Sequence, residues 1–427
     1  MTVKIIEGDA LAMLRTLPAG TFQCCVTSPP YFGLRDYGVE GQMGLEESPE
    51  AFVAGMVAVF REVRRVLRDD GTLWLNIGDS YASSPPGNVR GVSERSGLNG
   101  AASDKYRETL MAGHATKRDT SKLPGIKPKD MIGIPWMLAF ALRADGWFLR
   151  CDVIWSKPNP MPESVTDRCT KAHEYVFLLT KRPTYFYDQE AIREGRTSDE
   201  DANGFRGGAY VRDLGIDNAA MGKRKVVGNK RVKVPGGWDN KPGGHSTIHR
   251  TGRTEAEYVE AETREGRNAR SVWTIATEPF KEAHFATMPT KLALRCVLAG
   301  SSERGQCPSC GAPWERLVKK TPMVLERSER THSMGQTRAS GTMVSPPSSE
   351  TIGWAPTCAC CWPHDPVPQH VLDPFGGAGT TALVADRLGR DATIIELNPA
   401  SIDIARRRIT GDSPLFAEVE HAAPQQG

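Results

Sequence analysis

Several patterns that assign a protein to a class are missing from this sequence. Nowhere do about 18 apolar residues follow one another, so we expect no membrane-spanning helix and no membrane partner. Residues 1–8 lack the basic stretch and apolar run of an export signal, and we therefore expect a cytoplasmic protein. The formal net charge of +3 is too small to indicate a polyanionic partner by itself. A functional assignment therefore depends on the motifs and on the local distribution of charge.

The length and composition predict a globular chain with long insertions. The 427 residues exceed the usual size of one domain, and the 42 Gly and 30 Pro indicate many loops. We expect an ordered front half at 1–190, a basic region at 191–280, an ordered back half at 281–412 and a tail at 413–427. A flexible polar insertion at 82–129 interrupts the front half, and a cysteine-bearing insertion at 305–363 interrupts the back half.

Apolar periodicity in both halves alternates between strand and helix. Apolar runs predict strands at 3–6, 22–26, 72–77, 148–155, 175–180, 371–372 and 392–396. Helical spacing predicts helices at 10–17, 49–67, 135–145, 285–300, 380–388 and 399–409. This alternation is typical of an α/β fold with a parallel sheet and crossover helices.

A glycine-rich turn follows the strand that ends at Asp373. Gly376, Gly377 and Gly379 precede a helix whose first backbone NH groups are free to meet a polar ligand. Glu396 ends the next strand, 23 residues after Asp373, where an acidic residue can bind ribose hydroxyls. A tight turn without a ligand is the alternative. A dinucleotide dehydrogenase is less consistent, because the run DPFGGAGTT does not match GxGxxG, and the phosphate-free cofactor S-adenosyl-L-methionine fits better.

The run Thr27, Ser28, Pro29, Pro30, Tyr31 follows a predicted strand near the front of the chain. The two prolines lack NH groups, which leaves nearby carbonyls free as acceptors beside the Ser28 hydroxyl. Two acceptors would draw a weakly nucleophilic exocyclic amine toward tetrahedral geometry, and Tyr31 could stack on a base flipped from a duplex. A rigid polyproline loop without chemistry is the alternative.

Cysteines cluster in the insertion of the back half. Cys307 and Cys310 form a CxxC knuckle, and a second group contains Cys358, Cys360 and Cys361. Two such turns supply the four thiolates of tetrahedral zinc, so we expect a structural zinc ion, with His364 as a weaker ligand. Either Cys360 or Cys361 could provide the fourth thiolate.

The basic charge is concentrated in residues 203–254. Eleven Lys or Arg face three Asp there, an excess of eight positive charges, with aromatic residues interleaved. Such a stretch is suited to tracking a phosphate backbone, although a solvated loop is the alternative.

Together these motifs resemble the β-group of DNA amino-methyltransferases, the N4-cytosine and N6-adenine class. The resemblance covers roughly 3–80, 135–187 and 284–409, with the motifs in the order of that group. It implies a permuted Rossmann-like S-adenosylmethionine-dependent fold, a catalytic front half, a cofactor-binding back half and a target-recognition region between them. The implied partners are double-stranded DNA and a cognate restriction endonuclease. The sequence indicates neither a recognition site nor an oligomeric state.

The resemblance also implies residue roles. Ser28, Pro29, Pro30 and Tyr31 would hold the amine, and Asp373, Phe375, Gly376, Gly377 and Gly379 would form the cofactor loop. Glu396 would bind the ribose beside Asn398, Asp9 would lie near the adenine, and His284, Phe285 and Thr287 would close over the methionine end. Asn159, Pro160, Met161 and Pro162, with His173 and Glu174, resemble the lining of the target-base pocket. Related enzymes with this insertion tend to show CxC, which favours Cys360.

Three functional interpretations follow from the sequence. The first is methyl transfer to a flipped base in duplex DNA, with N4 of cytosine favoured by the serine at position 28 and N6 of adenine as the alternative. The second is a non-catalytic zinc-bearing DNA-binding protein, which would retain DNA without binding a cofactor. The third is an amino-methyltransferase that acts on RNA or protein. This interpretation is less consistent with the long basic interval.

Overall fold

The computed structural model describes residues 2–33, 39–83, 120–121, 123–195, 266–278, 280, 287–322, 324–331, 337–345, 348–360, 365–412 and 418–422. The chain divides into two compact units, the first made of Met1–Ile192, Ala269–Leu317 and Thr351–Gly427, the second of Arg193–Asn268 and Val318–Glu350. The basic stretch 203–254, most of the insertion at 82–129, and His284, Phe285, Cys361 and His364 lie outside the described residues.

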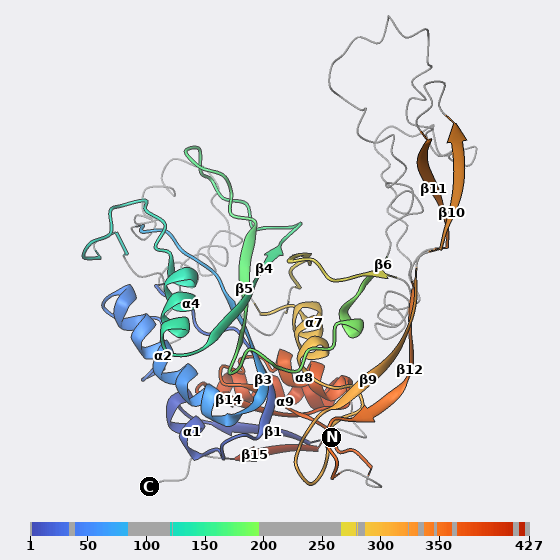
Figure 1. Ribbon diagram of the computed structural model, residues 1–427. Helices are drawn as coiled ribbons and strands as arrows, with labels where there is room; N and C mark the ends of the chain where they lie inside the picture. Colours follow the sequence, from blue (N-terminus) through green and yellow to red (C-terminus); the bar gives the residue numbers. More distant parts are fainter. Residues whose placement is uncertain are drawn as a thin grey trace, which may run out of the picture. The chain divides into compact units, whose positions relative to one another are not determined.

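A nine-stranded sheet forms the centre of the first unit (Figure 1). Its order is β15 (Glu418–Ala422), β1 (Thr2–Glu7), β14 (Asp391–Glu396), β13 (His370–Asp373), β2 (Phe22–Thr27), β3 (Leu67–Ile77), β5 (His173–Thr180), β4 (Phe148–Ser156) and β8 (Val272–Thr274). Strand β5 runs antiparallel to both neighbours, and all other neighbouring pairs are parallel. The expectation of a parallel sheet is therefore wrong for β5, which is antiparallel to β3 and β4. The connection 157–172 contains no crossover helix, so β5 returns beside β4 as a hairpin.

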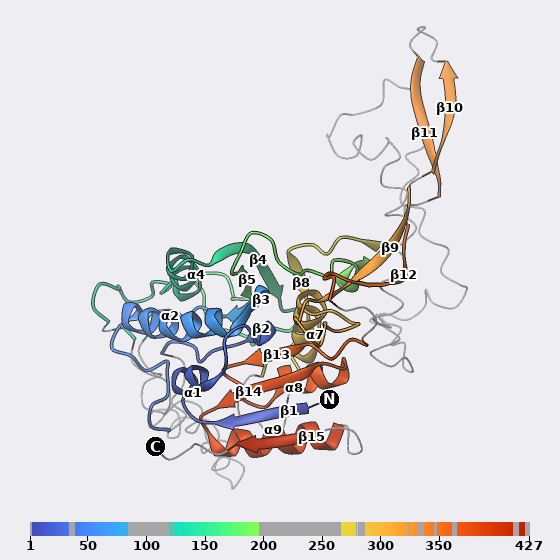
Figure 2. The same cartoon turned by 60° about the horizontal axis from the view of Figure 1, so that its bottom comes forward.

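The order of strands explains how motifs far apart in sequence meet. Strands β13 and β14 come from the back of the chain, yet they lie between β1 and β2 (Figure 2). Leu372 of β13 is paired with Cys25 of β2 in parallel register. The carboxyl ends of these two strands therefore meet at one edge of the sheet, the edge at which open α/β sheets bind ligands.

Two layers of helices cover the sheet. Helices α1 (Ala10–Thr16), α2 (Pro49–Val66) and α4 (Ile134–Ala144) pack in one layer, and α7 (Thr290–Gly300), α8 (Thr380–Arg387) and α9 (Pro399–Asp412) in the other. Alternation along β3 separates the layers, because Leu73, Leu75 and Ile77 join the apolar cluster around α2. Thr72 and Trp74 face the opposite way, toward Gly300 at the end of α7.

Helix α2 shows how the sequence determines these elements. The Ser48 hydroxyl accepts a hydrogen bond from the Ala51 NH at 3.1 Å, and proline at position 49 suits the first turn. The apolar side chains at helical spacing, Phe52, Met56, Val59, Phe60 and Val63, are all buried. In the described part of the chain, no helix is both long and apolar enough to span a membrane.

Several elements have weak sequence signals and were not expected. They are η2 (Glu190–Ile192), β6 (Glu194–Gly195), β7 (Gly266–Arg267), β8, β9 (Trp314–Thr321), β10 (Val324–Thr331), β11 (Thr337–Ser345), β12 (Ser348–Pro356) and β15. Strand β15 lies within the expected tail and pairs with β1 in parallel, so the tail prediction was wrong for Glu418–Ala422. This pairing covers an edge that β1 would otherwise present. The ends of the insertion at 82–129 also pack on the core, since Thr120 and Leu123 are buried.

Candidate active site

A cavity of about 310 Å³ opens at the carboxyl edge of the sheet. Strand β2 leads directly into the Ser28–Tyr31 motif, and β13 leads into the glycine-rich turn, so both motifs line the same cavity. The predicted site residues that line it are Asp9, Ser28, Pro29, Pro30, Tyr31, Glu174, Thr287, Asp373, Phe375, Gly376, Gly377, Glu396 and Asn398. Predicted site residues from the front and the back of the chain thus line the same cavity.

Tyr31 is held at one side of this cavity by polar partners. Its hydroxyl donates a hydrogen bond to Glu174 Oε2 at 2.5 Å, and Glu174 Oε1 is ion-paired with Lys157. The Asn76 amide donates to the same Glu174 oxygen at 3.2 Å. Side chains of Lys157 and Glu174 are 18% and 14% exposed, so the pair is shielded from water and keeps a defined geometry. The arrangement places an ammonium and a carboxylate beside the Ser28–Tyr31 motif.

The backbone at Gly78 leaves room for the Tyr31 ring. A Cβ at position 78 would lie 2.6 Å from Tyr31 Cε2 and 3.3 Å from Glu174 Cδ. We therefore expect Gly78→Ala to displace the ring and to lower kcat for the methyl transfer that the sequence resemblance implies by about 10-fold, because small misplacements near a reaction are costly. Steady-state kinetics with measured cofactor affinity would check this.

Gly411→Ala is the matched control for Gly78→Ala. It lies in α9, and a Cβ there has no neighbour within 4 Å. Equal activity of the two variants would contradict the role assigned to the contact between Gly78 and the ring.

The turn from β13 to α8 is shaped by hydrogen bonds to the neighbouring strand β14. Gly376 NH donates to Ile395 O at 2.8 Å, and Gly377 NH donates to Glu396 Oε2 at 2.7 Å. The other Glu396 oxygen accepts from Asn398 NH at 2.8 Å. Burial raises the pKa of Glu396 above its ordinary value. The hydrogen bonds from the Gly377 and Asn398 NH groups fix this carboxylate at the cavity wall.

Gly379 differs from the other predicted loop residues, because it does not line the cavity. It precedes α8 with a φ of 74°, and a Cβ there would lie 2.9 Å from the Ala405 Cβ of α9. Glycine at this position is explained by helix packing and a left-handed backbone. The sequence pattern alone does not distinguish this role from ligand contact.

Asp373 joins the two motifs directly. Its carboxylate accepts hydrogen bonds from Thr27 Oγ1 at 2.7 Å, Thr381 Oγ1 at 2.8 Å and the Phe375 NH at 3.0 Å. Thr27 ends the strand before Ser28, and Thr381 lies in α8. The side chain therefore fixes strand β2 against the glycine-rich turn, and burial raises its pKa to about 6.

This raised pKa predicts a pH-dependent stability. A folded-state pKa above the ordinary value of 3.8 means that the contribution of Asp373 is complete below about pH 4 and is lost as pH rises through 6. The loss above pH 7 amounts to about 3 kcal/mol at 1.36 kcal/mol per pKa unit. Asp373→Asn removes the titration, and its amide can still donate to the Thr381 hydroxyl. Urea unfolding of wild type and variant at pH 5 and pH 8 would check this, and parallel pH profiles would contradict it.

Other carboxylates around the cavity are also engaged. Asp9 caps α1 by accepting from Ala12 NH at 2.8 Å. Glu278 accepts from the Thr290 NH at 2.9 Å and from its hydroxyl, at the first residue of α7. Glu278 was not predicted from the sequence, since no local spacing links it to a helix that begins 12 residues later. Lys157 and Asn76 were missed too, although a polar Asn76 inside the run LWLNI is a detectable signal.

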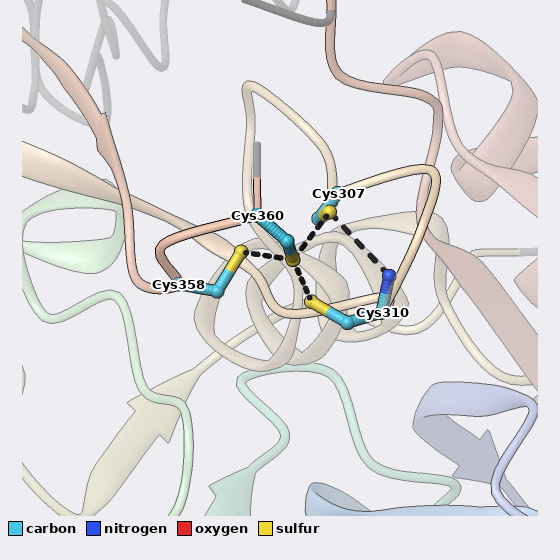
Figure 3. Close-up of side chains that lie close together, drawn as sticks. All are labelled: Cys307, Cys310, Cys358 and Cys360. Carbon is cyan, nitrogen blue, oxygen red and sulfur yellow. Dashed lines mark hydrogen bonds between the residues drawn. The ribbon is translucent and has the colours of Figure 1, made fainter. Parts of the chain in front are cut away.

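Four cysteine sulfurs form a second cluster (Figure 3). The Sγ atoms of Cys307, Cys310, Cys358 and Cys360 all lie within 4.8 Å of one another, and Cys360 is 3.2 Å from Cys310 and 3.3 Å from Cys358. Sulfur atoms around tetrahedral zinc are separated by about 3.8 Å, given Zn–S bonds of about 2.3 Å. Backbone NH groups of Ser309 and Cys310 point at Cys307 Sγ, as in a metal-binding knuckle. The four cysteines therefore fit a tetrahedral metal ion such as zinc, and among the described residues Cys360 supplies the fourth sulfur.

These features define a class: an α/β protein in which the Ser28–Tyr31 motif and the glycine-rich turn line one cavity at the carboxyl edge of the sheet, as expected of a DNA methyltransferase. The family model described as DNA methylase (N6_N4_Mtase) matches residues 22–307. Over 408 residues the chain is 36% identical to the type II methyltransferase M.Cfr9I of Citrobacter freundii, covering 96% of this chain and 88% of that protein. It is 33% identical over 406 residues to the type II methyltransferase M.SmaI of Serratia marcescens, covering 95% and 90%.

The chain belongs to the N6/N4 DNA methylase family and is a DNA methyltransferase of the amine-specific class. Among solved structures, PvuII DNA methyltransferase (cytosine-N4-specific) matches with a TM-score of 0.47 at 12% identity, covering 98% of this chain and 95% of that one.

Proposed function

We propose that this protein transfers a methyl group from S-adenosyl-L-methionine to the exocyclic amine of a base that has left duplex DNA, with N4 of cytosine as the favoured target. One observation carries the proposal: the Ser28–Tyr31 motif and the glycine-rich turn lie at the ends of adjacent parallel strands and line one cavity. Direct transfer needs an amine acceptor and a sulfonium donor held against each other, and proximity supplies much of the acceleration.

The cofactor side of the cavity is formed mainly by the back half of the chain. Glu396 would accept hydrogen bonds from the ribose hydroxyls, with Asn398 beside it, and Asp9 would lie near the adenine. Gly376, Gly377 and Phe375 would border the same ligand, with Thr287 at the methionine end. His284 and Phe285, which lie outside the described residues, would complete that closure. When bound, S-adenosyl-L-methionine supplies an electrophilic methyl group.

The amine side is formed by the front half. The Ser28 hydroxyl and the carbonyls next to Pro29 and Pro30 would accept the amine hydrogens and direct its lone pair toward the methyl donor. Tyr31 would stack on the extruded ring, held in orientation by Glu174. Ser28 or a water would take the proton late in the reaction. No covalent bond to the enzyme is needed.

Cytosine is favoured by two features of this side. Serine at position 28 is the residue more typical of cytosine enzymes in the family that the sequence resembles. The Lys157 ammonium, buried against Glu174, offers several donors. Cytosine presents two neighbouring acceptors, N3 and O2, beside its amine, whereas adenine presents N1 alone on that edge. N6 of adenine is the alternative target.

Duplex DNA is the proposed substrate, with the basic stretch 203–254 as the phosphate-tracking region. The relatives are named type II methyltransferases, which supports a cognate restriction endonuclease as a partner in the cell. The cysteine cluster would hold a structural zinc ion, because methyl transfer from a sulfonium needs no Lewis acid. Its four ligands lie on the two chain segments that lead into and out of residues 318–350.

A labelled-methyl competition assay tests the substrate class. The purified protein is incubated with S-adenosyl-L-methionine carrying a labelled methyl group, together with duplex DNA, RNA and bulk protein. Label in duplex DNA that declines steeply with added salt supports the proposal. Label in RNA or protein would contradict it, and DNA retention without cofactor binding would indicate a non-catalytic DNA-binding protein.

A further inference from the structure

Met161 is unusually exposed for an apolar side chain. Among the exposed large hydrophobic side chains of the described residues, it has the largest exposed fraction, 88%. It lies in the loop 157–172 between β4 and β5, and the sequence resemblance places it in the lining of the base pocket. In the structure Lys157 and Glu174 line the cavity, whereas Met161 does not. With so large an exposed fraction, the side chain is directed into solvent and is accessible to a partner.

Alternating prolines stiffen the loop around Met161. Prolines at 158, 160 and 162 fix their own φ angles, and each restricts the residue before it to an extended backbone. Met161 therefore presents its side chain with little backbone freedom. An exposed apolar group on a stiff loop loses less conformational entropy on binding than one on a flexible loop.

The loop is fastened beside the cavity at its start. Asn159 Nδ2 donates to Thr277 Oγ1 at 3.0 Å, and the Thr277 NH donates to Asn159 Oδ1 at 3.0 Å. Thr277 and Lys157 both line the cavity. Met161 is the second residue after this anchor, so the methionine lies close to the cavity.

The second half of the loop is fastened as well. Arg168 donates to Glu163 Oε2 at 2.7 Å, and its guanidinium lies 3.9 Å from the centre of the Tyr81 ring. Lys171 Nζ donates to the carbonyl of Asp79 at 2.8 Å. Met161 thus lies between two anchored ends, next to the space proposed for the flipped base.

We propose that Met161 is a wedge that enters the base stack of the duplex where the target base leaves it. This inference rests on the proposed function. Extruding a base costs a few kcal/mol of stacking and pairing, and an apolar side chain in the vacated space offsets part of that cost. Methionine suits the role, because its unbranched, polarizable side chain adapts to an irregular gap.

Paired substrates can separate a wedge from a general binding contact. Two duplexes carry the same methylation site, located by sequencing modified DNA: one fully paired, one with an abasic position opposite the target base. In the second duplex the target base is already unpaired. We expect Met161→Ala to lower kcat/KM by about 10-fold on the paired duplex and by less than about 2-fold on the abasic one. Met161→Leu should retain most of the activity on both.

Met131→Ala is the matched control, since Met131 is also exposed, at 55%, but lies outside the loop. It should leave both rates unchanged. An equal loss for Met161→Ala on both duplexes, or no loss on either, would overturn the wedge while the wild-type enzyme still methylates DNA. If the wild type methylates neither duplex, the proposed function fails and the wedge fails with it.

Discussion

Alanine in place of Ser28 is expected to lower kcat for DNA methylation by about 100-fold or more. The hydroxyl lines the cavity between the β2 strand and the two prolines, where it would accept a hydrogen from the amine. That acceptor is worth most when the nitrogen becomes tetrahedral, and the loss of one well-placed polar group of this kind costs about 100- to 1000-fold in kcat. Cofactor affinity should change little, because the ribose-binding role is assigned to Glu396 and not to Ser28.

Single-turnover methylation and equilibrium binding of S-adenosyl-L-methionine would separate these effects. Ser48→Ala is a suitable control, because it removes a helix-capping hydroxyl that does not line the cavity. It should cost about 1 kcal/mol of unfolding free energy and leave kcat unchanged. A folded Ser28→Ala protein that methylates DNA at the wild-type rate would contradict the assigned role.

Serine in place of Cys310 is expected to release the metal and to destabilise the protein. The cluster joins sulfurs that are 50 residues apart in sequence, Cys310 and Cys360, so a bound zinc ion closes a long loop. The loop at Cys310 also contacts the core, since Arg68 donates to the Cys310 carbonyl at 3.3 Å. We expect about one zinc ion per wild-type chain, much less in the variant, and a Tm lowered by at least about 5 °C.

Cys169→Ser is the control for this substitution, because Cys169 is an exposed free cysteine outside the cluster. It should retain zinc and the wild-type Tm. Elemental analysis of the purified proteins, followed by thermal unfolding with and without a chelator, makes the comparison. A wild-type protein without zinc, or a Cys310→Ser variant with unchanged metal content and stability, would contradict the zinc site.

The sequence was sufficient to predict the parts of the site that have local signals. The Ser28–Tyr31 motif and the glycine-rich turn each follow a short apolar strand, and this local pattern places them at the edge of a sheet. The strand before Ser28 was also expected to lie in the same sheet as the strand that ends at Asp373. The strand order, with β13 and β14 between β1 and β2, provides the physical basis for that expectation.

Other parts of the site depend on contacts between distant segments. The ion pair of Lys157 with Glu174 joins the two ends of a hairpin, and the Glu278 carboxylate caps a helix 12 residues away. The antiparallel direction of β5 follows from a connection without a helix, whereas the alternating pattern alone favoured a parallel sheet. Gly379 matched a ligand-loop pattern, but its Cα faces α9. Each of these features depends on a contact between segments that are distant in sequence. Such a contact leaves no periodicity and no fixed spacing from which it could be predicted.

Identification of the methylated nucleoside tests the central claim most directly. Duplex DNA is incubated with the protein and S-adenosyl-L-methionine carrying a labelled methyl group, digested to nucleosides and separated. Transfer to an exocyclic amine, with N4-methylcytosine as the labelled product, is the result that the geometry of Ser28, Lys157 and Glu174 predicts. Labelled N6-methyladenine would still support methylation of an exocyclic amine, but it would show that the target base is adenine and not cytosine. Label on a ring carbon, or no label in DNA under conditions where the cofactor binds, would contradict the assignment of this cavity to amine methylation.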